Sequence, residues 1–190
     1  MNNNLNPWKI LKEEIIAEYP IFSIKKSLRQ NPLSKEEIEF ILVNGLDWVN
    51  VLAFTENEEL VLVRQYRHGI EEYTLELPGG CVEKHEQDAK KAAMRELLEE
   101  TGYFSDDVQY LGALRPNPAM YNMRNTFFIA RDCKKVGNQN LDQGEDIDIV
   151  VKPYAEILST VKSGEFTHGM CTAAIGLYEL NKKFTPSDEV

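Results

Sequence analysis

Runs of apolar and β-branched residues recur along the chain, and short polar segments with Gly, Pro or Asn separate them. Such runs are typical of β-strands, and the separating segments are typical of turns. The pattern predicts strands at residues 21–28, 36–43, 48–54, 60–66, 73–77, 108–114, 125–130 and 147–151.

Three other stretches have helical character, at residues 88–100, 154–161 and 170–182. In the first, Ala92, Ala93 and Leu97 are spaced to line one side of a helix, and Gly102 follows as a C-terminal cap. Strands with interspersed helices, without strict alternation, predict an α+β fold with a mixed sheet packed between helices.

The first part of the chain is less apolar and carries two of these strands on its own. We therefore divide the sequence into an N-terminal β extension, residues 1–45, and a main domain, residues 46–190. A two-stranded hairpin is marginal alone in water, so the extension must dock on its own core or on a second subunit.

Charge and composition narrow the classes of partner. The 190 residues carry a net charge of −10, which disfavours a nucleic acid polymer but not a small phosphate ligand held through metal ions. The cysteines, Cys81, Cys133 and Cys171, lack a disulfide framework and are expected to be reduced. Without a signal core or a membrane-length apolar run, the expectation is a soluble, cytoplasmic protein with no membrane partner.

The most informative stretch is residues 77–103. On a helix, Glu96, Glu99 and Glu100 fall within about a third of a turn of one another, so their carboxylates repel. A divalent cation would offset this repulsion, because hard cations prefer several carboxylate oxygens. The preceding pair, Gly79 and Gly80, lets the backbone approach such a cation or a phosphate. The alternative is a solvated acidic face.

This stretch, LPGGCVEKHEQDAKKAAMRELLEETGY, resembles the signature box of the Nudix hydrolases. Its second half, from Arg95 to Tyr103, fits at every position. In the first half, eight residues separate Glu86 from Arg95 instead of seven, which indicates one extra residue before the helix. The flanking segments LVLVRQYRHGIEEYTLELPGG and GEDIDIVV, and Pro118, resemble the ADP-ribose and nucleoside-diphosphate-sugar pyrophosphatase branch of that family.

The resemblance implies a Nudix-type α/β/α sandwich and a homodimer organised by residues 1–45. It also implies Mg²⁺-dependent hydrolysis of ADP-ribose or a related nucleoside-diphosphate sugar, with Mn²⁺ as the other candidate cation. The products would be a nucleoside monophosphate and a sugar phosphate. Two alternatives stay open: another Nudix branch acting on dinucleoside polyphosphates or NADH, and a non-catalytic ADP-ribose-binding module, which should have lost the box carboxylates.

The resemblance also assigns roles to residues. Glu96, Glu100 and Glu99 would be metal ligands, with a backbone carbonyl from Gly79 or Gly80. Arg95 would hold Glu86 or Glu83 by a bidentate pair. The general base stays open between Glu145, Glu99 and a metal-bound hydroxide.

The substrate would be bound by cations and an aromatic side chain. Arg67 is expected to clamp a diphosphate oxygen, with help from Arg29 or Arg124. Pro118 marks the substrate branch, and Trp48 would stack on a base or belong to the core. The histidines, His68, His85 and His168, lack metal-ligand spacing and are expected to be structural or surface residues.

Overall fold

The computed structural model describes residues 6–183. The chain forms two compact units. The first contains the chain up to Leu46 together with Arg115–Arg124, and the second contains Asp47–Leu114 and the chain from Asn125 onward. Pro118 therefore belongs to the first unit, although the sequence places it within the main domain. The division of the chain into functional domains at residues 45 and 46 stays a prediction.

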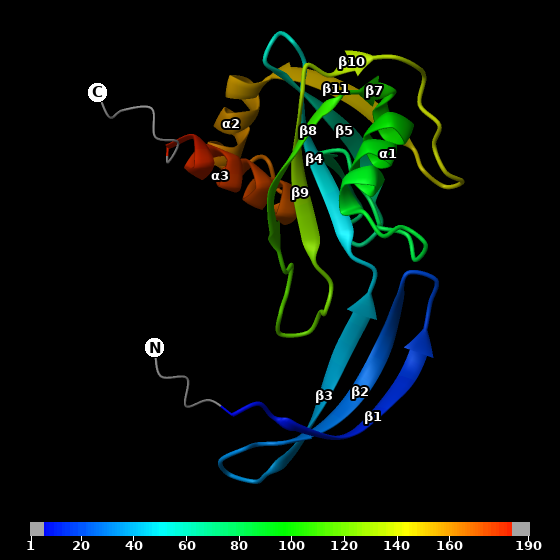
Figure 1. Ribbon diagram of the computed structural model, residues 1–190, viewed down its shortest axis with the longest axis vertical. Coiled ribbons are helices and arrows are strands. Elements are labelled where there is room, and N and C mark those ends of the chain that lie inside the picture. The colour runs from blue at the N-terminus through cyan, green and yellow to red at the C-terminus, as the bar shows by residue number, and fades with distance from the viewer. Residues whose placement is uncertain (1–5, 184–190) are drawn as a thin grey trace. The chain divides into compact units, whose positions relative to one another are not determined.

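The first unit is an antiparallel sheet of three strands in the order β1 (Lys9–Glu18), β2 (Phe22–Gln30) and β3 (Glu37–Gly45), drawn in blue in Figure 1. The strands β2 and β3 match the two predicted ones. The prediction missed β1, whose apolar residues come in adjacent pairs such as Ile15 and Ile16 and do not alternate along the strand. The segment from residue 115 to 124 joins this unit through a hydrogen bond from the Val43 amide to the Met120 carbonyl.

The second unit contains a six-stranded mixed sheet. Its order is β11-β5-β4-β9-β8, and β6 pairs with β5. The pair β4 and β9 is parallel, and its neighbours in the sheet are antiparallel. The strands are β4 (Trp48–Phe54), β5 (Glu59–Arg67), β6 (Glu72–Glu76), β8 (Asp107–Leu114), β9 (Asn125–Arg131) and β11 (Ile147–Pro153). Two short strands that the sequence did not predict, β7 (Tyr103–Phe104) and β10 (Lys134–Lys135), pair separately.

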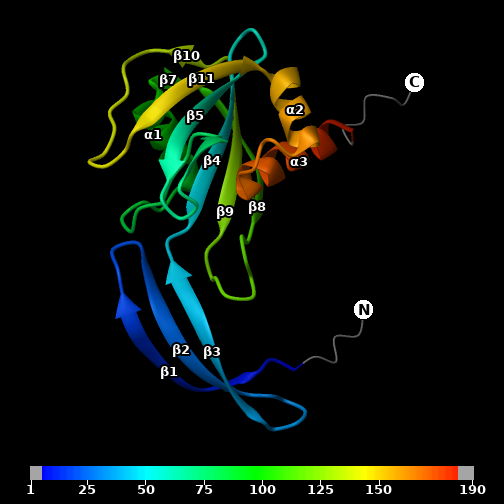
Figure 2. The same cartoon turned by 180° about the vertical axis from the view of Figure 1, so that it is seen from behind.

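Helices cover both faces of this sheet. The helix α1 (Ala89–Thr101) lies on one face, and α2 (Tyr154–Ser163) and α3 (Gly169–Lys183) lie on the other (Figures 1 and 2). The Asp88 carboxylate caps the start of α1 by accepting from the Lys90 amide, and Gly102 ends the helix at a φ of 70°. The predicted limits of this helix are thus confirmed.

The side chains of β4 alternate between two hydrophobic cores. Val49, Val51 and Ala53 pack in the cluster that contains Leu97 of α1. The cluster on the opposite face contains Leu52 and Phe54 of the same strand, and Ile157, Ala174 and Ile175 of α2 and α3. The period of two along a strand therefore produces two separate cores. The expected α/β/α sandwich with a mixed sheet is confirmed.

Candidate active site

Three carboxylates project from the second half of α1. Glu96 and Glu100, one turn apart, are largely buried, with 13% and 3% exposure respectively. The Glu99 side chain is 37% exposed. Leu97 packs α1 against the sheet, and Glu96 and Glu100 lie against the turn that follows β6.

That turn, from Leu77 to Gly80, brings backbone against the carboxylates. The Gly79 amide donates to Glu100 Oε2 at 2.8 Å. A Cβ on Gly79 would collide with the Val49 carbonyl, and a Cβ on Gly80 would collide with the Glu96 carboxylate. The close approach of the backbone therefore requires glycine at position 79, whereas a side chain at position 80 would displace the Glu96 carboxylate.

The carbonyls of the turn differ in their availability. Pro78 and Gly80 accept hydrogen bonds from the amides of Val51 and Val49. Among residues 6–183, no such bond reaches the Gly79 carbonyl. Of the two glycines that the sequence offered as a backbone ligand, Gly79 is thus the one with an available oxygen.

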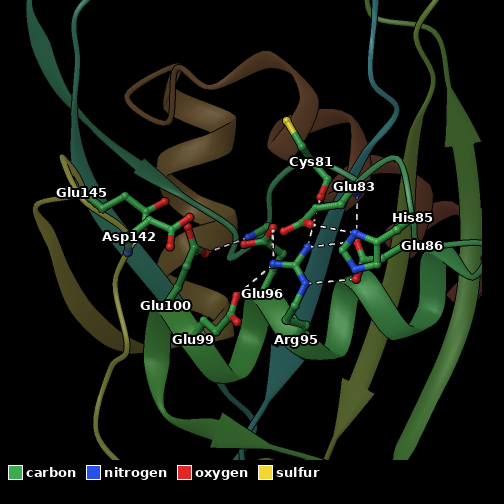
Figure 3. Close-up of polar contacts among 11 residues, drawn as sticks. Cys81, Glu83, His85, Glu86, Arg95, Glu96, Glu99, Glu100, Asp142 and Glu145 are labelled. Carbon is green, nitrogen blue, oxygen red and sulfur yellow. Dashed lines mark hydrogen bonds and ion pairs between the residues drawn. The ribbon is translucent and has the colours of Figure 1, made fainter. Parts of the chain in front are cut away.

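Arg95 is surrounded by carboxylates (Figure 3). Its Nε and Nη2 donate to the two oxygens of Glu86 at 3.0 and 3.1 Å. Its Nη1 lies 3.0 Å from Glu96 and 2.8 Å from Glu99. The structure thus pairs Arg95 with Glu86 and not with Glu83. The extra residue of the box leaves this pair intact, because the loop before α1 absorbs it.

Burial and mutual repulsion make the site electrostatically unfavourable without a cation. Burial raises the pKa of Glu96 to about 7, against the opposing charge of Arg95. Burial likewise raises the pKa of Glu100 to about 8, although the Gly79 amide opposes it. The charge of Glu145 raises both values further. Oxygen donors in this number, crowded and partly desolvated, suit a hard divalent cation.

Glu145 reaches the site from the loop before β11. Figure 3 shows it with Asp142 opposite Glu100. The Glu145 carboxylate accepts from the Asp142 amide at 2.9 Å, and both residues are exposed. The resemblance of GEDIDIVV to the Nudix branch singled out Glu145, whereas Asp142 lies before that segment and received no role.

Arg67 and Trp48 also lie in the second unit. Arg67, at the end of β5, lines a cavity of about 570 Å³ together with Glu145. Its guanidinium forms a bidentate pair with Glu76, a residue to which the sequence gave no role. Trp48 is half-buried at the start of β4 and pairs with Cys81 across an isolated bridge, so its role in stacking stays a prediction.

Two further candidates, Arg29 and Pro118, meet in the first unit, which also contains Arg124. They line a pocket of about 690 Å³ that also contains Trp8, Phe40 and Lys25. Trp8 and Phe40 pack edge to face with ring centroids 5.6 Å apart. The sequence gave no sign of these two aromatic residues, because they are distant in the chain and meet only when β3 and the segment before β1 come together.

One site thus combines carboxylates on a single helix, a glycine turn against them and an Arg–Glu pair. Residues 47–168 match the NUDIX domain. The chain belongs to the NUDIX family. This match covers the sandwich up to the start of α3, including every residue of the candidate active site in the second unit described above.

Individual relatives agree with this NUDIX assignment. The chain is 28% identical to a protein named "Methanol dehydrogenase activator" from Bacillus methanolicus over 92% of this chain and 96% of that one. It is 29% identical to an "ADP-ribose pyrophosphatase" from Bacillus subtilis, with the same coverage. A solved structure titled "Crystal structure of ADP compounds hydrolase" matches with a TM-score of 0.83 and 22% identity, covering 94% of this chain and 96% of that one. That structure supports the fold alone.

The structure bears on two further expectations, the state of the cysteines and the lack of a membrane-length apolar run. The three cysteines are free, as predicted. Within residues 6–183, no helix is both long and apolar enough to cross a membrane.

Proposed function

We propose that this NUDIX protein hydrolyses the diphosphate bridge of ADP-ribose or a related nucleoside-diphosphate sugar, releasing a nucleoside monophosphate and a sugar phosphate. The observation that carries the proposal is the pair Glu96 and Glu100, held one turn apart against the Gly79–Gly80 turn. The relative named "ADP-ribose pyrophosphatase" supports this substrate class.

The donor set fits Mg²⁺, or Mn²⁺ in its place. Glu96, Glu100 and Glu99 would supply carboxylate oxygens, and Gly79 would supply its carbonyl. When bound, the cation would polarise the diphosphate and lower the pKa of a water ligand. The raised pKa values of Glu96 and Glu100 support the fit, since a divalent charge favours the ionised carboxylates that the bare site disfavours.

The chain's own residues orient this site and handle the proton. Arg95, fixed by the bidentate pair with Glu86, also forms ion pairs with Glu96 and Glu99 and so orients both carboxylates. Arg67 would clamp a diphosphate oxygen in the cavity that it shares with Glu145. Glu145 is exposed, and its place on the loop opposite Glu100 suits a general base that takes the proton of the attacking water. Glu99 is the alternative base.

The pocket of the first unit suits a nucleoside. Trp8 and Phe40 offer aromatic surface for a base, and Arg29 and Lys25 offer positive charge for a phosphate. Pro118 completes the wall. We include Arg29 and Pro118 among the substrate-binding residues on this ground, and Trp48 on the resemblance alone.

A substrate panel tests the activity directly. Purified protein with Mg²⁺ is offered ADP-ribose, GDP-mannose, UDP-glucose, NADH and diadenosine polyphosphates, and the phosphate products are separated by chromatography. ADP-ribose or a close nucleotide sugar should have the highest kcat/KM. A marked preference for NADH or a diadenosine polyphosphate would assign another branch. Tight ADP-ribose binding without turnover would indicate a binding module.

The sheet of the first unit supports a homodimer. Its strands expose large apolar side chains, and an exposed patch of this kind marks an interaction surface. These side chains are Ile10, Leu11, Ile15, Ile16, Ile38 and Ile41. A second copy of the chain would cover them, as the resemblance implies. Light scattering should give twice the monomer mass, and Ile15→Glu should shift the protein toward the monomer. A monomeric wild-type protein would contradict the proposed homodimer.

We place the enzyme in the cytoplasm.

A further inference from the structure

Glu76 is a buried carboxylate outside the carboxylate helix. It ends β6, directly before the Leu77–Gly80 turn, and is 1% exposed. A carboxylate in such a place requires a cation or hydrogen-bond donors around both oxygens. Its partners therefore indicate why a charge is kept there.

Both oxygens of Glu76 are occupied. Oε1 accepts from Arg67 Nε at 2.6 Å and from the Thr74 hydroxyl at 2.5 Å. Oε2 accepts from Arg67 Nη2 at 2.5 Å, and His168 Nε2 lies 3.4 Å away. Burial alone would raise the pKa of Glu76, but the bonds from Arg67 and Thr74 outweigh it and lower the pKa. The Arg67 guanidinium thus forms a planar, bidentate ion pair, or fork, with the ionised Glu76 carboxylate.

The fork fixes the direction of the rest of the guanidinium. Binding through Nε and Nη2 leaves Nη1 and the second N–H of Nη2 for another acceptor. The Arg67 side chain is 35% exposed and lines the cavity that contains Glu145. Arg67 also interacts electrostatically with Glu100. Its remaining donors therefore border the space proposed for the diphosphate.

His168, the residue just before α3, completes the arrangement. Its Nδ1 accepts from the Cys171 amide at 3.3 Å, in the first turn of α3. A neutral ring that accepts at Nδ1 carries its proton at Nε2, the atom that faces Glu76. Burial lowers the pKa of His168, which favours this neutral form.

The same side chains have the chemistry of a zinc site. Donor atoms of Glu76, His168 and Cys171 lie within 4.8 Å of one another. Three features oppose a metal there. Arg67 occupies both oxygens of Glu76, His168 Nε2 bears a proton, and burial raises the pKa of the Cys171 thiol. The contacts favour an anchor for Arg67 over a metal ligand set.

We propose that Glu76 and His168 are positioning residues, which hold the Arg67 guanidinium with its free N–H groups toward the diphosphate bridge. This rests on the proposed function, because it concerns how the same site binds its substrate. The sequence treated His168 as a structural or surface residue and gave Glu76 no role. The contacts give both a specific one.

A double-mutant cycle tests the proposal. KM and kcat for ADP-ribose with Mg²⁺ are measured for wild-type protein, Glu76→Gln, Arg67→Lys and the double variant. Calorimetric binding of ADP-ribose in EDTA gives a second readout without turnover. Lysine cannot form the fork, and glutamine cannot hold it as an ion pair, so each single variant should raise KM about tenfold, with kcat changed less. The KM of the double variant should be no higher than the higher of the two single-variant KM values.

His168 offers a matched pair of substitutions. His168→Asn can keep the bond to the Cys171 amide but cannot reach Glu76, whereas His168→Gln can place an amide N–H near Nε2 of the original ring. KM should rise in His168→Asn and return toward wild type in His168→Gln. These variants also keep the test valid if Glu76→Gln fails to fold.

Several results would overturn the positioning role. Additive effects of Glu76→Gln and Arg67→Lys, or equal KM values for the two His168 variants, would do so. Stoichiometric Zn²⁺ binding that Cys171→Ser abolishes would assign the cluster to a metal. A wild-type protein that binds ADP-ribose without turnover would refute the proposed function alone, since the binding cycle still tests the anchor. A wild-type protein that neither binds nor hydrolyses ADP-ribose would refute both the proposed function and the positioning role.

Discussion

Replacement of Glu100 by glutamine should stabilise the metal-free protein and abolish most of its activity. The carboxylate is 3% exposed and its pKa is raised from 4.5 to about 8, with burial as the main cause. A glutamine side chain has almost the same shape as glutamate, and its amide oxygen can still accept the hydrogen bond from the Gly79 amide. Glu100→Gln therefore removes a buried charge without removing its hydrogen bond.

The magnitude follows from the two pKa values. In the unfolded chain Glu100 releases its proton near pH 4.5, whereas in the folded metal-free protein it keeps the proton up to about pH 8. Between these values the folded state binds more protons, so stability falls as pH rises. Each tenfold change in the acid constant corresponds to about 1.4 kcal/mol, so ionising Glu100 at pH 8 costs on the order of 4 kcal/mol.

Urea denaturation in EDTA measures this difference. At pH 8, Glu100→Gln should be more stable than the wild type by up to about 4 kcal/mol, and the gap should shrink toward pH 5. Addition of Mg²⁺ should narrow this gap, because a ligand that binds only the folded state stabilises it by about 2.7 kcal/mol at 100 times its Kd, and should close it near 1,000 times the Kd, where the gain is about 4.1 kcal/mol. Turnover should fall by about 10²–10³.

The control is Glu99→Gln on the same helix. Its carboxylate is 37% exposed and paired with Arg95, so its replacement should not stabilise the metal-free protein. If Glu100→Gln is no more stable than the wild type at pH 8, the buried-charge argument is wrong. If it retains Mg²⁺-dependent stabilisation and near-normal turnover, the metal site does not lie on this helix.

Three further changes test other contacts. Gly79→Ala should lower kcat and the melting temperature together, because its Cβ would collide with the Val49 carbonyl; an unchanged enzyme would contradict the close approach. Glu86→Gln should lower kcat about tenfold with little change in KM, since it weakens the fork that holds Arg95, whereas a KM effect alone would assign Glu86 to substrate binding. Phe127→Ala should cost about 3–5 kcal/mol in urea denaturation, because the side chain is fully buried between the sheet and α3; a loss below 1 kcal/mol would contradict that packing.

Much of the carboxylate helix follows from local sequence. The spacing of Glu96 and Glu100 places them one turn apart on any α-helix. Asp88 and Gly102 limit the helix through bonds within a few residues, so their effect can be predicted without knowledge of the fold. The apolar run of β4 likewise predicts a strand, and the structure places a core on each of its two faces.

The hydrophobic pattern of the sequence did not predict a strand that lacks an apolar face. The residues of β1 are mostly exposed and many are charged, so this strand exists through its ladder with β2 and not through burial. The short pair β7 and β10 depends in the same way on hydrogen bonds to a distant partner.

The sequence by itself determined the fold class, the carboxylate helix and the glycine turn, because short-range geometry and hydrophobic period set them. Only the tertiary structure decided which partner each polar side chain takes. Arg95 selects Glu86 over Glu83, and Arg67 is anchored by Glu76. Hydrogen bonds and ion pairs depend on distances of about 3 Å in space, which a polar residue's place in the sequence does not encode.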